Sequence, residues 1–177
     1  MEFNHELEIL MLRSSKELKP VHLSIGKLKA LIFLDLSFCW NSMELPREVG
    51  KLEELKELHL EYSPIITEIP TSIGSTRKLK KLTVNFCKSL KGIPNSIGDL
   101  QNLQHLSIEN SPVEIFPSAI GRLKKQRSLC LKCCKGEIPH EISELSSLRS
   151  LCLSISTRIV GSQTSPSLPQ LSYLIHL

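Results

Sequence analysis

Apolar residues recur along this chain at a short spacing inside each segment and at a long spacing between segments. The short pattern is LxxLxxLxL, clearest at Leu52, Leu55, Leu58 and Leu60. Its last two leucines have one residue between them, which predicts a short strand with both leucines inward and His59 outward. One such segment cannot bury its own leucines, so neighbouring segments must stack.

Six turn segments set the long spacing at 22–24 residues, and five of them follow an apolar–proline pair. Proline fixes φ and lacks an N–H, so these pairs suit a convex arc where no ladder bond is needed. Stacking would place the strands side by side, about 4.8 Å apart in a parallel sheet. The segments begin at Ile25, Val49, Ile73, Ile97, Ile120 and Ile142.

This pattern resembles the leucine-rich-repeat signature, whose period is 20–29 residues. The resemblance implies an α/β-type solenoid, or horseshoe, with a parallel sheet on the concave face and irregular or short helical and 3-10 segments on the convex face. We expect a single domain over 1–177 with about seven repeats of 22–24 residues. Its parts are a partial N-terminal repeat (1–20), regular repeats (21–156), and a loop with a partial terminal repeat (157–177).

The amino-acid composition argues against several classes of function. Hydrophobic residues make up 41% and charged residues 23% of the 177 positions, which argues against disorder. The net charge of +4 is far below that of a typical nucleic-acid binder, so we expect no nucleic-acid partner. No signal peptide and no apolar run of about 18 residues is present. Without a secretory signal, the six cysteines indicate reduced thiols and a cytoplasmic location.

Residues that flank the inward leucines should form columns on the concave face. The rim column holds Phe38, Tyr62 and Phe86 in three successive repeats. Exposed neighbouring aromatic residues are typical of partner anchors, but the rings could instead fold over the edge of the core. Both interpretations stay open here. The candidate protein-interaction residues are Phe33, Asp35, Phe38, Glu57, His59, Glu61, Tyr62, Lys81, Asn85, Phe86, His105 and Glu109.

No residue constellation indicates catalysis or a cofactor, so we expect a protein that is not an enzyme. A GxxxxGK[ST] phosphate-binding loop is absent. Asp35, His59 and Ser37 should lie near one another, but the serine is closer to the acid than to the base. An open sheet also excludes little water.

The cysteines divide into two groups. In leucine-rich repeats the position of Cys39, Cys87 and Cys134 belongs to a ladder that bonds neighbouring backbone, so the resemblance implies a structural role. Cys130 and Cys152 should face outward on adjacent strands while Cys134 points inward, which argues against one zinc centre. Oxidation of Cys130 and Cys152 to a disulfide remains geometrically open.

The amino-acid sequence of the repeats resembles one protein family in particular. Stretch 87–98, CKSLKGIPNSIG, looks like the repeats of plant intracellular nucleotide-binding leucine-rich-repeat disease-resistance proteins. The resemblance implies a recognition module that senses a pathogen effector, or a host protein altered by one. It also implies autoinhibition of the nucleotide-binding module. The chain begins inside a repeat and ends on an apolar residue, so we expect a fragment, a truncated gene product or a partner-dependent piece. The alternative is a free-standing intracellular adaptor similar to the Ras-group leucine-rich-repeat proteins.

Overall fold

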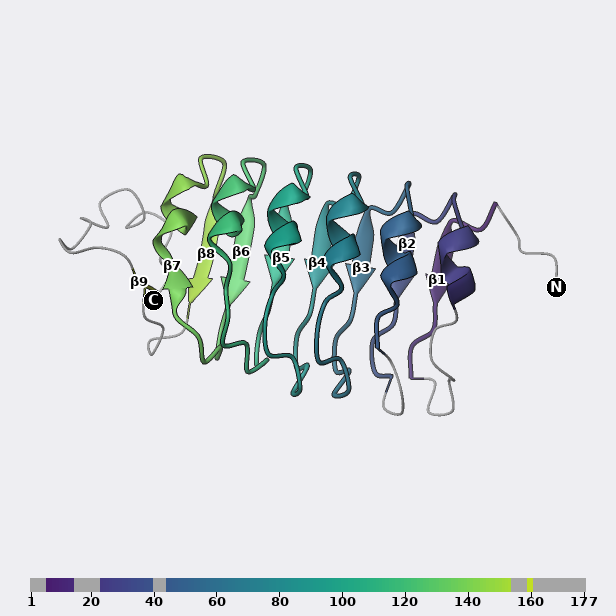
Figure 1. The fold of residues 1–177 in the computed structure, drawn as a ribbon, viewed down its shortest axis with the longest axis horizontal. Helices are drawn as coiled ribbons and strands as arrows, with labels where there is room; N and C mark the ends of the chain where they lie inside the picture. The colour runs from purple at the N-terminus through teal and green to yellow at the C-terminus, as the bar shows by residue number, and fades with distance from the viewer. Residues whose placement is uncertain (1–5, 15–22, 40–43, 154–158, 161–177) are drawn as a thin grey trace.

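The chain winds into stacked coils, each contributing one strand to a parallel sheet (Figure 1). The computed structural model describes residues 6–14, 23–39, 44–153 and 159–160. Strands follow one another in chain order across the sheet because each coil pairs with the next. They are β1 (Ile9–Met11), β2 (Phe33–Asp35), β3 (Glu57–His59), β4 (Lys81–Thr83), β5 (His105–Ser107), β6 (Ser128–Leu131) and β8 (Ser150–Leu153).

The sheet has the register that the leucine pattern predicts. Leu58 at the centre of β3 pairs with Leu34 on one side and Leu82 on the other. All three are fully buried, while the residues beside them point to the opposite face of the sheet. A slip of one residue would move every leucine into solvent, so the register is strongly specified.

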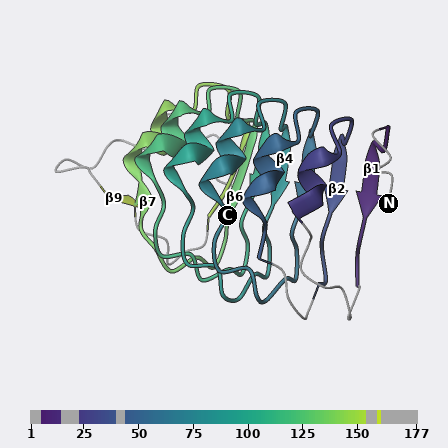
Figure 2. The same cartoon turned by 45° about the vertical axis from the view of Figure 1, so that its right-hand side comes forward.

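Short 3-10 helices line the side of the coils opposite the sheet, as Figure 2 shows. Five of the six follow a proline of an apolar–proline pair, and each of these prolines has an extended backbone. The expected parallel sheet and short 3-10 segments are therefore confirmed. The helices are η1 (Leu23–Lys27), η2 (Arg47–Lys51), η3 (Thr71–Ser75), η4 (Asn95–Asp99), η5 (Ser118–Arg122) and η6 (His140–Glu144).

A second row of parallel pairing joins the coils just before the helices. Isolated bridges link Glu68 to Gly92, Gly92 to Ile115 and Ile115 to Glu137. At the end of the row, β7 (Ile138–Pro139) pairs with β9 (Ile159–Val160). From Glu68 onward, successive coils are thus tied to one another at two places on their circumference.

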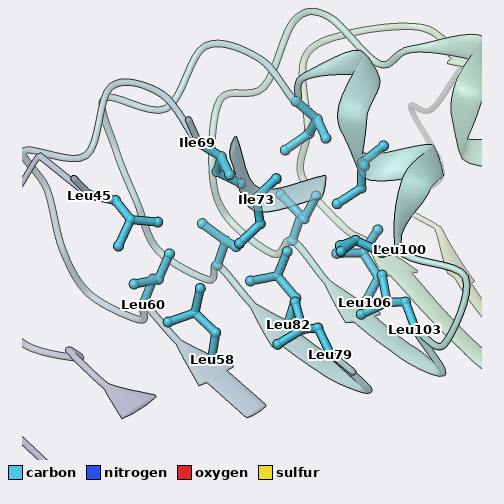
Figure 3. Close-up of a cluster of buried hydrophobic side chains, with 14 of the residues drawn as sticks. Leu45, Leu58, Leu60, Ile69, Ile73, Leu79, Leu82, Leu100, Leu103 and Leu106 are labelled. Carbon is cyan, nitrogen blue, oxygen red and sulfur yellow. The ribbon is translucent and has the colours of Figure 1, made fainter. Parts of the chain in front are cut away.

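The core is a continuous stack of leucine and isoleucine between the sheet and the helices, and Figure 3 shows part of it. Some polar residues are also buried, among them Thr76 and Gln126. Thr76 satisfies its hydroxyl by donating to the carbonyl oxygen of Ile73 at 2.6 Å. Gln126 donates to the Ser128 carbonyl oxygen at 2.6 Å, but its own side-chain oxygen is buried without a partner.

The cysteine ladder lies inside the turn that follows each strand. The Cys39, Cys87 and Cys134 thiols donate to backbone carbonyl oxygens of the preceding coil, which confirms their structural role. Ser63 and Ser111 fill the same position elsewhere and donate in the same way. Burial raises the pKa of the Cys87 thiol to about 11 and that of Cys134 to about 12.

Candidate protein-binding surface

The candidate interaction residues lie in four columns along the concave face, which is the outer face of the sheet. Strand pairing places the first residue of each strand in one column and the third residue in the next. Two further columns follow in the turn after each strand. In that order the columns hold Phe33, Glu57, Lys81 and His105; Asp35 and His59; Glu61, Asn85 and Glu109; and Phe38, Tyr62 and Phe86.

The last column forms an aromatic ladder of Phe38, Tyr62 and Phe86. Tyr62 stacks on Phe38 with ring centroids 4.6 Å apart and on Phe86 with centroids 4.3 Å apart. The guanidinium of Arg13 lies over the free side of the Phe38 ring, 5.6 Å from its centroid. The rings are partly exposed, so they form an apolar strip along one edge of the concave face.

All three ladder residues have a left-handed backbone, with φ of 62°, 52° and 58°. Their backbone N–H groups donate to the next coil, for example from Tyr62 to the Asn85 carbonyl oxygen at 2.8 Å. The fold therefore sets this conformation, which costs a bulky L-residue about 1–2 kcal/mol. Ser14, Asn110 and Cys133 occupy the same position with the same backbone. Hence the solenoid does not need an aromatic ring there.

Beside the ladder, a chain of polar side chains crosses the middle of the concave face. Asn85 is at its centre, and its side-chain oxygen accepts from the Ser107 hydroxyl and the Glu109 N–H, each at 2.9 Å. Its amide nitrogen donates to a Glu61 carboxylate oxygen at 3.5 Å. Glu109 in turn accepts from the Cys130 thiol at 3.2 Å. Such cross-strand bonds fix the side chains in place before any partner arrives.

Asp35 differs from the expectation that it faces a partner, because it is only 4% exposed. Its carboxylate pairs with the Arg13 guanidinium at 3.2 Å and accepts from the Ser37 N–H at 2.9 Å. The Ser37 hydroxyl then accepts from the Glu61 N–H at 3.2 Å. Asp35 therefore organises this end of the concave face, where little of its own side chain is accessible.

His59 links two candidate residues to a buried threonine. Its Nε2 is 3.2 Å from a Glu57 carboxylate oxygen, and its Nδ1 is 3.0 Å from the Thr83 hydroxyl. Its ring also lies 5.2 Å from the Phe33 ring, centroid to centroid. The structure thus brings Phe33, Glu57 and His59 together. Lys81 is the register partner of Glu57 on the next strand, and His105 lies one strand farther along the sheet.

Lys81 and His105 border a hollow of about 680 Å³ over β4 to β8. Small side chains, among them Ser107, Ser128 and Cys130, line it together with longer ones. Small residues leave room where longer side chains would fill the concave face. This hollow gives a partner side chain a place to enter beside the polar chain.

Several contributors to this surface were missed as candidates. Arg13 supports both Asp35 and the aromatic ladder, and Lys80 and Gln104 line the hollow. Lys80 and Gln104 come directly before their strands, so counting one position back from each strand would have found them. Arg13 occupies the same position in the β1 coil as Glu61 and Asn85 occupy in theirs. Extending this column to the first coil would have found it in the sequence.

Within the part of the chain that the structure describes, no three side chains of His, Cys, Asp or Glu gather as a metal site. No disulfide joins any of the six cysteines, all of which lie among the described residues.

Comparison with solved structures identifies the architecture. The leucine-rich-repeat domain of the type III effector XopL matches 82% of this chain and has a TM-score of 0.75 at 26% identity. This chain is a leucine-rich-repeat solenoid. The plant peptide hormone receptor RGFR1, solved with RGF2, matches 89% at 28% identity with a TM-score of 0.68. A leucine-rich-repeat protein of Leptospira interrogans matches 96% at 26% identity with a TM-score of 0.62.

Neither a protein-family model nor a curated protein matches the sequence. The leucine-rich-repeat chain covers 51% of the XopL domain, 30% of RGFR1 and 48% of the Leptospira protein. It thus spans about half or less of the length of each of these structures. Among the described residues, no helix is long and apolar enough to cross a membrane.

Proposed function

We propose that this leucine-rich-repeat chain is a non-catalytic protein-recognition module of plant innate immunity. On this proposal it lies in the cytoplasm as part of a nucleotide-binding leucine-rich-repeat receptor. There it senses a pathogen effector or a modified host protein, and it keeps the nucleotide-binding module inactive. The repeat sequence at residues 87–98 supports the assignment to this receptor class.

The aromatic ladder carries the recognition part of the proposal. Serine, asparagine or cysteine fills the same turn position in other coils, so the rings of Phe38, Tyr62 and Phe86 are not required for folding. They nevertheless stand in adjacent coils beside the fixed polar chain. Partly exposed aromatic residues next to ordered polar groups are typical of interface hot spots. RGFR1, a solenoid of similar fold, was solved with the peptide RGF2, which supports a protein or peptide partner here.

The first test is to sequence the native transcript beyond both ends of the present chain. An in-frame upstream segment with a GxxxxGK[ST] loop would support the receptor assignment. A transcript that encodes residues 1–177 alone would contradict it and would favour the free-standing Ras-group-like adaptor.

The second test uses that nucleotide-binding module as the probe. We expect the solenoid to bind it in a pull-down, and we expect Phe38→Ala, Tyr62→Ala and Phe86→Ala together to reduce binding at least tenfold, as for a hot spot of about 1.4 kcal/mol or more. The matched control is Arg77→Ala with Lys88→Ala, two exposed positions off the concave face. Equal loss in both variants would contradict the role of the aromatic ladder.

A further inference from the structure

Two cysteines face each other on the concave face and take no part in the cysteine ladder. Cys130 of β6 is the direct register partner of Cys152 of β8, so their side chains leave the same face of the sheet at adjacent positions. Both side chains are partly exposed, whereas the three ladder cysteines are buried. Adjacent parallel strands lie about 4.8 Å apart, within the range of about 4.4–6.8 Å between Cα atoms that a disulfide spans.

We propose that Cys130 and Cys152 form a dithiol modification site, which peroxide oxidises to a disulfide between β6 and β8. This site goes beyond the proposed function, because neither its chemistry nor its test involves a recognition partner.

The neighbouring charges give the two thiols different roles. Contact with Cys152 raises the pKa of the Lys132 ammonium, so a positive charge stays beside this thiol. Cys130 donates its S–H to a Glu109 carboxylate oxygen at 3.2 Å. Burial, together with contacts to Cys152 and Glu109, raises the pKa of the Cys130 thiol and keeps it protonated. Cys152 is therefore the attacking sulfur and Cys130 the resolving one.

The reaction balances with hydrogen peroxide as the oxidant. The Cys152 thiolate attacks one peroxide oxygen, the O–O bond breaks, and the departing hydroxide takes up a proton to become water. Cys130 then attacks the sulfur of the Cys152 sulfenic acid while Glu109 accepts its proton. The sulfenic hydroxyl takes up that proton from Glu109 and leaves as the second water. Two thiols and one peroxide thus give one disulfide and two waters.

The disulfide would also change the polar chain. Reduced Cys130 donates a hydrogen bond to Glu109, which also accepts from the Ser107 hydroxyl at 3.3 Å. Oxidation removes the S–H donor and leaves Glu109 with one side-chain donor fewer. The modification would therefore alter the concave face beside the hollow.

Trypsin separates the relevant cysteines, which makes the test direct. Peptide 128–132 carries Cys130, peptide 150–158 carries Cys152, and peptide 133–135 carries Cys133 and Cys134. The folded full chain is treated with hydrogen peroxide, blocked with N-ethylmaleimide, digested without reductant and measured by mass spectrometry. We expect 128–132 joined to 150–158, lighter than their sum by two hydrogen atoms. Free thiols should fall from six to four and return with dithiothreitol.

Single substitutions test the role of each residue in the oxidation. Cys130→Ser and Cys152→Ser should each abolish the cross-linked peptide, and Glu109→Gln should slow its formation. Cys133→Ser is the matched control, because this cysteine is exposed at the rim and should leave the cross-link unchanged. A sulfinic acid at Cys152 without a cross-link would overturn the proposal. So would a bond to Cys133, or a disulfide between two chains on a non-reducing gel.

Discussion

At the scale of single residues, Tyr62 combines an unfavourable backbone with two favourable ring contacts. Its left-handed φ costs about 1–2 kcal/mol, and each stacked pair returns about 0.5–1.5 kcal/mol. Tyr62→Asn should therefore change the free energy of unfolding by less than about 1 kcal/mol, since asparagine tolerates this backbone, as Asn110 does. Urea denaturation measures the change. Tyr62→Ala should be less stable than Tyr62→Asn, because it keeps the strain and loses the rings.

A loss of about 3 kcal/mol in Tyr62→Asn would contradict that balance. It would show that the ring is part of the core, and the aromatic ladder would lose its main support as a recognition surface.

Gln126 is a polar residue at a position that is apolar in other coils. It is fully buried where other coils have Leu55, Leu79 and Leu103, and its side-chain oxygen has no partner. An orphaned buried acceptor costs about 1–3 kcal/mol, more than the hydrogen bond that its amide donates to Ser128 returns. We expect Gln126→Leu to raise the free energy of unfolding by about 1 kcal/mol in urea denaturation. Gln101→Leu, at an exposed position, should give no such gain.

Cys87 gives the fold a dependence on alkaline pH. Burial raises the pKa of its thiol from 9.0 to about 11, so the folded state holds the proton where the unfolded state has lost it. This contribution to stability is fully present below about pH 9 and disappears as the pH rises towards 11. The free energy of unfolding should therefore fall more steeply above pH 9 in the native chain than in Cys87→Ser, which keeps the ladder bond. Parallel slopes in urea denaturation would contradict this.

At the scale of elements, the 3-10 helices pack so closely that glycine is required between coils. A Cβ added to Gly98 in η4 would lie 2.5 Å from the Ala119 carbonyl oxygen of η5. Gly98→Ala should therefore lower the free energy of unfolding by about 2 kcal/mol or more, as an overpacked site does. Gly92 is the matched control, since its added Cβ would meet nothing closer than 3.5 Å. Gly92→Ala should be neutral in the same urea experiment.

The strands and their register could be predicted from the sequence because only one register buries the leucines. Leu34, Leu58 and Leu82 are fully buried in one register and exposed in the register shifted by one residue. The same pattern placed the candidate residues in their columns. It carries no information on φ, so the left-handed backbone of Tyr62 was beyond it. The burial of Asp35 depends on Arg13, a contact between coils that hydrophobic spacing does not encode.

At the scale of the whole molecule, the solenoid is a one-dimensional stack. The main contacts join each strand to the next strand and each 3-10 helix to the next helix, and the bridges between them follow the same order. Hydrogen bonds of the cysteine ladder likewise reach one coil back. A stack with such contacts has a stability that is close to a sum of coil and neighbour-interface contributions. Distant substitutions should then act independently, while substitutions at one interface should couple.

Two double-mutant cycles test this arrangement in urea denaturation. Tyr62→Asn and Gln126→Leu lie in separate, non-adjacent coils, so their effects on the free energy of unfolding should add within about 0.5 kcal/mol. Gly98→Ala and Ala119→Gly share the interface of η4 and η5, where the added Cβ would lie 2.9 Å from the Ala119 Cβ. Removing that methyl relieves part of the clash, so the double variant should be more stable than the sum predicts by more than about 0.5 kcal/mol. Coupling of that size in the distant pair would instead mean that strain travels along the stack, and that recognition at one coil could be felt several coils away.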